Sequence, residues 1–320
     1  MKQKEILVFG ASGQIGRHLI RKLTKNNYKV IAVTRNIHQK GYILKTQASP
    51  GYLEIKELNS FKSDKIKSLL ENCSICINLI GILYEKRKRH FESIHADFPS
   101  LLSECCKNQK LEQLIHISSL GIEDAVDSNY AISKLKGENE VRKKFNRSVI
   151  LKPSIVYSVD DNFTTNFMTL LSRLPFMPLY YNGETKFTPI HVTDMAEIIY
   201  QIIQQKIISQ TIECVGPEVL SFKDIILKLL TSIDKKRLLI PLPLTIAKIT
   251  AKIFELMPKP LLTSDQLKLL KYDNVVSGKN KSNFDFKIYA NKKFENEIAN
   301  YSFNWRKGGQ FAKINISKNN

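Results

Sequence analysis

Apolar and polar positions follow two different rhythms along the first half of the chain. Short runs of consecutive apolar residues are typical of strands buried on both faces of a sheet. Most stretches between them repeat apolar residues at the three- and four-residue spacing of a helix. This alternation predicts a parallel sheet with helices on both of its faces. The predicted strands cover residues 5–9, 28–33, 52–55, 74–80, 113–118 and 148–152.

The pattern loosens after about residue 157. The predicted elements there are a loop over Leu174–Pro178, a short strand over Pro189–Val192, and helices over residues 194–205 and 221–232. Asp194 is the expected N-cap of the first of these helices. Prolines punctuate an apolar helix within Pro241–Pro260, and residues 273–320 are polar, rich in Lys and Asn, and expected to be partly irregular.

Three glycines, Gly10, Gly13 and Gly16, follow the first predicted strand and open an amphipathic helical run. Strand, glycine turn and helix in this order are typical of a dinucleotide pyrophosphate site. Glycine permits a tight turn and close backbone approach, and the helix N-terminus offers free N–H groups and a positive dipole end. The sequence therefore predicts an α/β fold of the Rossmann type, a doubly wound parallel sheet with a smaller, interleaved C-terminal domain. The predicted domains are residues 1–157 for nucleotide binding, with a returning segment near 189–205, and residues 158–320.

Arg35 indicates which dinucleotide is preferred. It stands nineteen residues after Gly16, where the second predicted strand ends. Sites for NAD(H) usually have Asp or Glu about 20 residues beyond the glycines, to accept the ribose hydroxyls. A guanidinium at this place pairs instead with a 2′-phosphate. The sequence thus favours NADP(H) over NAD(H), the alternative being that Arg35 is a surface residue and Asn36 contacts the ribose.

Tyr130 and Lys134 form a candidate catalytic pair behind Ser118-Ser119, which ends the fifth predicted strand. Side chains four residues apart share a helix face, and a nearby ammonium lowers the pKa of a phenol toward neutrality. Such a pair suits acid–base work in hydride transfer, with the Ser119 hydroxyl holding the substrate oxygen. The Tyr-x-x-x-Lys spacing occurs four times in the chain, so position rather than spacing selects this pair.

Residues 6–16, Ser118-Ser119 and the Tyr130/Lys134 pair together resemble the short-chain dehydrogenase/reductase superfamily, in its extended or atypical branch. Further blocks resemble the group that contains the nucleotide-binding accessory subunit of respiratory complex I and its bacterial relatives. These blocks are Asn78–Glu85, His116–Gly121, Leu151–Tyr157, Asp160–Phe163, Pro189–Asp194, Val215–Glu218 and Leu256–Pro260. The resemblance extends from residue 4 to about residue 275.

The resemblance implies roles for residues along one nucleotide site. Those implied to wrap the pyrophosphate are Gly10, Ala11, Ser12, Gly13, Gln14, Ile15 and Gly16, and Arg35 is implied to hold the adenosine phosphate. Those implied to line the path from adenine to ribose are Asn78, Leu79, Ile80 and Gly81. Tyr130 and Lys134 are implied to hold the nicotinamide ribose, and Pro153, Ser154 and Ile155 the carboxamide.

The chain departs from the pattern of the active enzymes in three places. The interval from Ser119 to Tyr130 is shorter than in extended reductases, which puts the substrate geometry in doubt. Ser158 replaces an expected glycine, and Glu57 stands where an adenine-contacting Asp is common. In the complex I subunit the nucleotide has a structural role and no turnover is established. The leading hypothesis is therefore an NADP(H)-binding assembly or stability factor for a membrane respiratory complex. The alternative is an active NADPH-dependent reductase or epimerase that uses Ser119, Tyr130 and Lys134.

Composition limits the partners and the compartment. The net charge of +19 comes mainly from 39 Lys rather than 10 Arg, without aromatic interleaving, so nucleic acid is a disfavoured partner. Five cysteines, an odd number, suggest a reducing compartment, and the Cys73/Cys76 pair lacks the second pair of a metal site. No run is long enough for a membrane span, and the first strand leaves no room for a cleavable signal. We expect a cytoplasmic or organelle-matrix protein, with a peripheral position at an inner membrane left open.

Two segments have more than one interpretation. Lys86–His90 is interpreted as a solvated charge run, with acidic lipid, an acidic partner or the cofactor phosphates as alternatives. Leu242–Leu256 is interpreted as a core helix of the second domain, the alternative being an amphipathic helix on a membrane surface.

Overall fold

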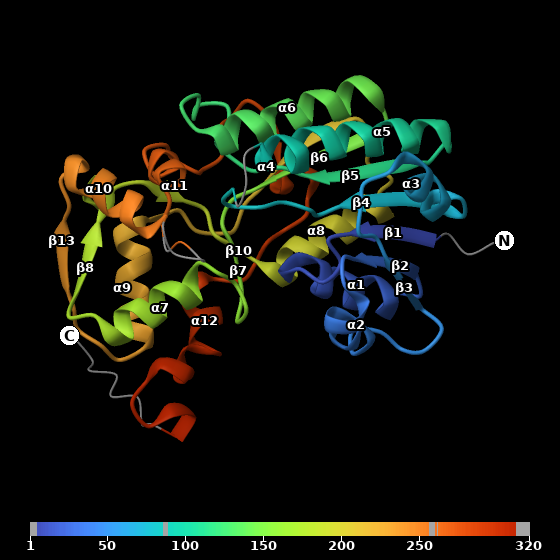
Figure 1. Cartoon of the computed structure of the whole chain (residues 1–320). Coiled ribbons are helices and arrows are strands. Elements are labelled where there is room, and N and C mark those ends of the chain that lie inside the picture. Colours follow the sequence, from blue (N-terminus) through green and yellow to red (C-terminus); the bar gives the residue numbers. More distant parts are fainter. Residues whose placement is uncertain (1–4, 86–88, 256–259, 261, 312–320) are drawn as a thin grey trace.

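The computed structural model describes residues 5–85, 89–255, 260 and 262–311 (Figure 1). Eight parallel strands form its main sheet: β1 Glu5–Phe9, β2 Lys29–Thr34, β3 Leu53–Glu57, β4 Cys73–Asn78, β5 Gln113–Ile117, β6 Ser148–Pro153, β11 Gln210–Cys214 and β14 Lys281–Ser282. Their order is β14–β11–β6–β5–β4–β1–β2–β3. The direction of winding reverses between β1 and β4, which is where open α/β sheets bind ligands.

Helices cover both faces of this sheet (Figure 1). On one face lie α1 Gln14–Lys25, α2 Ile37–Lys45 and α8 Val192–Gln204, and on the other lie α3 Ser63–Leu70, α5 Phe98–Asn108 and α6 Asn129–Lys144. Successive strand residues point to opposite faces. In β1, Ile6 and Val8 join the first core, whereas Leu7 and Phe9 join the second. Burial on both faces explains the unbroken apolar runs, and the predicted doubly wound parallel sheet is confirmed.

A second, smaller group of elements lies on the left of Figure 1. Its helices are α7 Thr164–Arg173, α9 Phe222–Ser232, α10 Leu244–Phe254, α11 Ser264–Leu269 and α12 Phe294–Ala299. Its strands form three pairs: β7 Val156–Tyr157 with β10 Ile190–His191, β9 Lys186–Phe187 with β12 Leu220–Ser221, and β8 Phe176–Leu179 with β13 Leu238–Pro241. Met168, Phe222 and Ile225 belong to its core, which the main sheet does not share. The later half of the chain nevertheless returns to the main sheet as α8, β11 and β14.

Shorter helical turns complete the described chain. They are α4 His90–Glu92, a π-helix over Ser93–Asp97, and 3₁₀ turns over Tyr180–Gly183, Asn283–Phe286, Ser302–Trp305 and Gly309–Phe311. Within the described ranges no helix is both long and apolar enough to cross a membrane.

Two local predictions were wrong, and a third holds only in part. Asp194 lies inside the first turn of α8, which begins at Val192, and its carboxylate accepts a hydrogen bond from the Lys292 N–H instead of capping the helix. Residues 176–179 form β8 rather than a loop, because pairing with β13 satisfies their backbone. The segment interpreted as a core helix, α10, buries only Ala247 and Ala251.

Candidate functional site

The glycine turn brings the end of β1 against the end of β4. Gly10 has a φ of +74°, a left-handed conformation that side chains disfavour. A Cβ on Gly10 would lie 3.0 Å from the Leu79 carbonyl carbon, and one on Gly16 would lie 2.5 Å from the Ala11 oxygen. The Gly13 N–H donates to the Gly10 oxygen at 3.0 Å and closes the turn. Gly10 and Gly16 are therefore required by close approach of backbone to backbone, and the turn is a cradle that a Cβ at either position would fill.

The N-terminus of α1 has the properties of an anion site. Its N-cap is Gly13, no side chain caps it, and its first turn contains no acidic residue. The first N–H groups of a helix have no partner within the helix, so they and the positive dipole end remain available to a phosphate. Ser12 is half-buried and Gly13 is exposed, so the turn is reachable from solvent.

Gln14 and Arg17 tie this helix end to the later half of the chain. The Gln14 amide donates to the Ser158 hydroxyl at 2.9 Å and to the Val156 oxygen at 3.3 Å. Arg17 forms an ion pair with Asp160, to which the Ser158 hydroxyl also donates. Ser158, which departs from the family's glycine, thus supplies a contact that glycine cannot make. No sequence motif marks this link, because its partners are more than 140 residues apart.

Arg35 lies just beyond β2, and its side chain is exposed. The next residue, Asn36, caps α2 by accepting a hydrogen bond from the Gln39 N–H at 3.0 Å. Glu57 ends β3 beside β2 and accepts a hydrogen bond from the Ile37 N–H at 3.1 Å, which lowers the pKa of its carboxyl below the ordinary value. Arg35 is therefore positioned at the rim of the sheet, whereas the side-chain oxygen of Asn36 is engaged as a cap.

Hydrogen bonds of the Asn78 side chain fix the end of β4. The Asn78 side-chain oxygen accepts from the Ile80 N–H at 3.1 Å, and its amide nitrogen lies 3.1 Å from His116 Nδ1. A Cβ on Gly81 would lie 3.3 Å from Lys134 Nζ. Asn78 at the end of β4, Gly81 in the segment that follows it and Lys134 on α6 therefore lie close together at the sheet edge.

Ser119, Tyr130 and Lys134 also converge, despite the short interval between the first two. Ser119 hydrogen-bonds the Tyr130 phenol, and Lys134 Nζ donates to the Ile117 oxygen at 3.1 Å. Helix α6 carries both later residues, and its N-cap is Ser128, which accepts from the Ala131 N–H at 3.3 Å. The two hydroxyls that hydride chemistry requires are in contact, and the ammonium is buried beside the β5 end.

The expected lowering of the phenol pKa is not found in this structure. Burial raises the pKa of Tyr130 above its ordinary value, and the hydrogen bond with Ser119 opposes this only in part. Burial also lowers the pKa of Lys134 to about 8, because the ammonium loses its hydration, although Glu138 favours the charged form. The physical reason for the correction is that desolvation disfavours both the phenolate and the ammonium.

Pro153 ends β6, and Ser154 and Ile155 follow it along the same edge. The Ser154 hydroxyl donates to the Asn274 side-chain oxygen at 2.6 Å and accepts from the Thr188 N–H at 3.2 Å. The Ile155 oxygen accepts from the Ile190 N–H at 2.9 Å, which begins the β7–β10 pairing. This segment joins the sheet to the smaller group of elements, and the Ser154 hydroxyl is already bonded on both sides.

His95 contributes a support that sequence reasoning did not single out. Its Nε2 accepts from the Ile82 N–H at 3.1 Å and its Nδ1 lies 2.9 Å from the Ser133 hydroxyl. Burial lowers the pKa of His95 to about 2, so it stays neutral and can accept. It lies in the π-helix Ser93–Asp97, an irregularity that often marks functional sites. A π-helix is not visible in a hydrophobic pattern.

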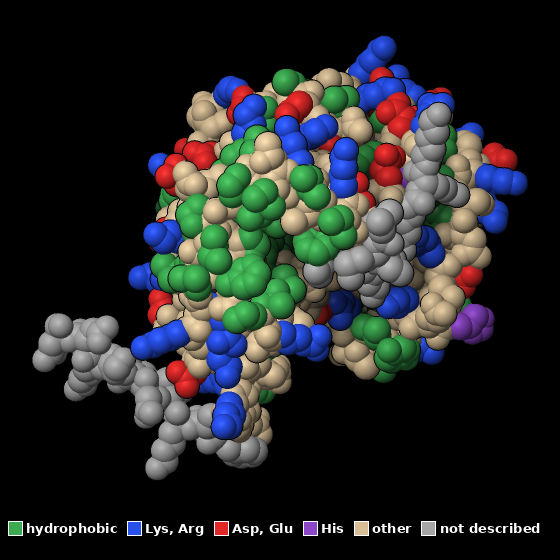
Figure 2. Space-filling model, turned by 60° about the vertical axis from the view of Figure 1, so that its left-hand side comes forward, with side chains coloured by type: hydrophobic (Ala, Val, Ile, Leu, Met, Phe, Trp, Pro, Cys, Tyr) green, Lys and Arg blue, Asp and Glu red, His purple; other side chains and the backbone are tan. Residues whose placement is uncertain are grey.

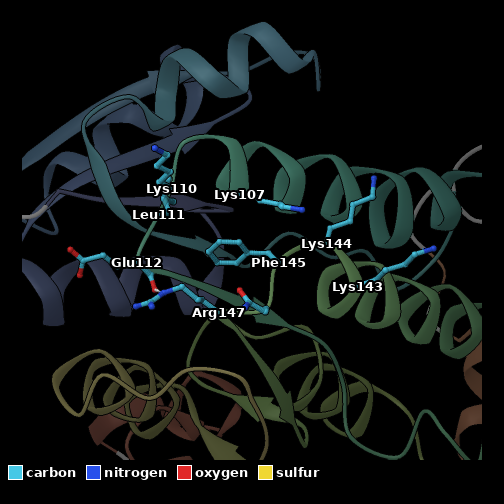
Figure 3. Close-up of a pocket in the computed structure, with 9 residues that line it drawn as sticks. Lys107, Lys110, Leu111, Glu112, Lys143, Lys144, Phe145 and Arg147 are labelled. Carbon is cyan, nitrogen blue, oxygen red and sulfur yellow. Dashed lines mark hydrogen bonds between the residues drawn. The ribbon is translucent and has the colours of Figure 1, made fainter.

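An open depression lies elsewhere on the molecule. It has a volume of about 650 Å³ and is lined mainly by the C-terminal ends of α5 and α6, at the opposite end of β5 from the glycine turn (Figure 3). Its lining includes Lys107, Lys143 and Lys144, and these side chains point apart rather than toward one centre. Cations are favoured at helix C-termini by the dipole, which accounts for them without a ligand. Among the described residues no group of three or more His, Cys, Asp or Glu could hold a metal.

The family follows from residues 6–213, which match the model of the NAD dependent epimerase/dehydratase family. The chain belongs to this family. The match covers the glycine turn, the β4 end and the Ser119/Tyr130/Lys134 group. The suspected membership in the short-chain dehydrogenase/reductase group is confirmed, and a nicotinamide dinucleotide is the cofactor class of the family.

Relatives match over most of the chain. The chain is 24% identical over 301 residues to the mitochondrial NADH-ubiquinone oxidoreductase 40 kDa subunit of Neurospora crassa, a match that covers 93% of this chain and 77% of that one. It is 26% identical over 271 residues to the mitochondrial NADH dehydrogenase [ubiquinone] 1 alpha subcomplex subunit 9 of Mus musculus, covering 84% and 72%. The solved dTDP-glucose 4,6-dehydratase DesIV of Streptomyces venezuelae, with NAD bound, has the same fold with a TM-score of 0.69 at 15% identity, covering 94% and 96%.

Proposed function

We propose that this chain binds NADP(H) along the carboxyl edge of its sheet and acts as an assembly or stability factor of a membrane respiratory complex of the complex I type. In this proposal the glycine turn and the α1 N-terminus hold the pyrophosphate, and Arg35 holds the 2′-phosphate. Tyr130 and Lys134 hold the nicotinamide ribose, and the segment Pro153–Ile155 faces the carboxamide. The nucleotide joins the main sheet to the smaller group of elements. The chain would work on the cytoplasmic or matrix side of the membrane that holds the complex.

The observation that carries the nucleotide half is the uncapped α1 N-terminus behind a turn that tolerates no Cβ at Gly10 or Gly16. A further support is Arg35, whose exposed side chain lies just beyond β2, the strand that pairs with β1. The assembly half is supported by the relatives, whose names are those of respiratory-complex subunits and which match across most of the chain. The structural role of the nucleotide is supported by the raised pKa of Tyr130, which makes the phenol a weaker acid for donating a proton to a carbonyl.

The cofactor preference is tested by measuring the affinities of NADPH and NADH for the purified protein. Charge-assisted hydrogen bonds contribute about 1.5–3 kcal/mol, so Arg35→Gln should weaken NADPH binding by about tenfold or more and leave NADH unchanged. Lys40→Gln, which removes an equal charge from an exposed position of α2, is the matched control and should change neither affinity. Equal affinity of the unaltered protein for the two nucleotides would overturn the assignment of NADP(H).

The assembly role is tested by copurification. The tagged full chain should carry subunits of the respiratory complex out of gently solubilised membranes, and its depletion should lower the amount of assembled complex. Absence of these subunits under conditions that preserve the complex would refute the assembly role, while the nucleotide measurement would stand on its own.

Tyr130→Phe separates a structural nucleotide from a turned-over one. The substitution keeps the ring packing against Phe91 and His95 and removes only the hydroxyl that bonds Ser119. We expect unchanged assembly and nucleotide binding weakened by about tenfold or less, because one neutral hydrogen bond to the ribose contributes about 0.5–1.5 kcal/mol. A reductase activity that is present in the unaltered protein and lost in the variant would establish the alternative, an enzyme acting on a carbonyl or alcohol.

A further inference from the structure

Helix α10 exposes its large apolar side chains to solvent, unlike a helix of a protein core. Only two small residues, Ala247 and Ala251, are buried, whereas Ile246, Ile249 and Ile253 are 46%, 61% and 57% exposed. These three isoleucines are spaced three and four residues apart, so they form one stripe along the solvent side of the helix. A helix that contributes to a core would bury its large side chains first, because they remove the most apolar surface from water. The stripe is therefore available to something outside the chain.

The strand pair before α10 extends this stripe. In the β8–β13 pairing, Phe176 lies opposite Leu238 and Pro178 lies opposite Ile240. Phe176, Leu238 and Ile240 are all exposed, while Met177 and Leu179 point into the core. We call the set Phe176, Leu238, Ile240, Ile246, Ile249 and Ile253 the apolar face. Figure 2 shows hydrophobic side chains gathered on this side of the molecule, with Lys and Arg around them.

The exposed charges near the apolar face are mainly basic. Lys248 and Lys252, four residues apart, flank the isoleucine stripe of α10, and Arg173 and Lys236 lie next to the two strands. All four are exposed, and among the described residues no carboxylate forms an ion pair with any of them. A large apolar surface rimmed by unpaired cations is complementary to a surface that is both apolar and anionic.

We propose that the apolar face docks on an anionic phospholipid bilayer, with α10 lying in the plane of the headgroups. The isoleucines would enter the acyl boundary, and the flexible stems of Lys248 and Lys252 would carry their ammonium groups to lipid phosphates. A bilayer fits better than a protein partner, because exposed lysines attract a diffuse negative surface without needing paired carboxylates at fixed places. This inference goes beyond the proposed function and depends on neither the nucleotide nor the respiratory complex.

The test is flotation of the full chain, without nucleotide, with vesicles of phosphatidylcholine alone or mixed with phosphatidylglycerol. We expect binding to the mixed vesicles, much weaker binding to the neutral ones, and loss of binding at high salt, which screens the lysines. Lys248→Gln with Lys252→Gln should weaken binding to mixed vesicles by about fivefold for each lysine, from about 1 kcal/mol per charge. Ile249→Glu should weaken binding to the mixed vesicles by about tenfold or more, because an exposed apolar side chain that would enter the bilayer is replaced by a charge that the lipid repels.

Tyr42→Glu is the matched control. Tyr42 is 66% exposed on α2, on the far side of the molecule from α10, so this variant adds the same charge at similar exposure and should float like the unaltered chain (Figure 1). Both variants should keep the same unfolding midpoint, since neither side chain is buried. No flotation with mixed vesicles, or equal flotation of Ile249→Glu and Tyr42→Glu, overturns the proposal. The proposal is also overturned if the chain does not bind vesicles and the Ile249→Glu variant no longer binds a protein partner, because the apolar face would then be a protein interface.

Discussion

Gly10→Ala tests whether the turn after β1 is fixed by close approach of backbone. Gly10 combines a φ of +74° with a Cβ position 3.0 Å from the Leu79 carbonyl carbon. Gly51 has a similar φ of +89° but nothing within 4 Å of its Cβ position. The pair Gly10→Ala and Gly51→Ala therefore shares the conformational cost of a left-handed residue, and only the first adds a steric cost.

The magnitudes follow from these two contributions. A left-handed conformation costs about 1–2 kcal/mol in a residue with a Cβ, and reduced freedom of the unfolded chain returns about 0.4–1 kcal/mol. Gly51→Ala should therefore lower the free energy of unfolding by about 0–1.5 kcal/mol. Overpacking against the Leu79 backbone adds about 1–3 kcal/mol, so Gly10→Ala should lower the free energy of unfolding by about 1–4.5 kcal/mol.

The assay is urea unfolding of both nucleotide-free variants, followed by circular dichroism and compared through midpoint and slope. Gly10→Ala should also weaken NADPH binding by about tenfold or more, because the new Cβ would displace the turn that holds the phosphates. Gly51→Ala should leave NADPH binding unchanged. If the two variants unfold at the same urea concentration, the close contact with Leu79 does not hold the turn, and the reasoning is refuted.

Three further predictions concern the supports of the site. The folded pKa of His95 is about 2 and its unfolded pKa is 6.5, so this residue lowers the free energy of unfolding by about 1.4 kcal/mol for each pH unit below 6.5. His95→Gln should therefore make stability less dependent on acid. An unchanged slope of stability against pH between 6.5 and 5, measured by thermal unfolding, would contradict this. Lys134→Met should be at least as stable as the unaltered chain at pH 7, because the folded pKa of about 8 reflects the cost of burying the ammonium. The variant should nevertheless bind nucleotide more weakly. A large loss of stability in calorimetry would argue against this desolvation cost. Gly137→Ala should destabilise the fold by about 3 kcal/mol or more, because the new Cβ would lie 1.8 Å from the His95 backbone oxygen. Helix propensity alone predicts a gain of about 1 kcal/mol instead. A rise in the thermal midpoint would therefore refute the contact.

The strands and the turn after β1 were predictable because their causes are local. A strand buried on both faces needs an unbroken apolar run, and Ile6–Phe9 shows one. The turn needs glycine where a Cβ would meet backbone, as at Gly10 and Gly16. The candidate site was predictable for a related reason: parallel strands end at one edge, so residues that follow different strands are brought together whatever their separation in sequence.

Contacts across the fold were not predictable, because each depends on partners that chain order does not reveal. The Gln14–Ser158 bond and the His95 support of Ile82 join segments whose approach only packing decides. The phenol pKa of Tyr130 was predicted with the wrong sign because spacing gives the Tyr–Lys distance along a helix but not the depth of burial.

The sequence alone was enough to predict the doubly wound sheet and its nucleotide turn, since both follow from local periodicity and from glycine's freedom of conformation. It also predicted that α10 is an apolar helix, but not which side of that helix packs against the protein. Packing decided this by seating Ala247 and Ala251 against the chain and leaving Ile246, Ile249 and Ile253 outside. The physical reason is that hydrophobic pattern reports which side chains avoid water, whereas only the tertiary structure shows what surface they find instead.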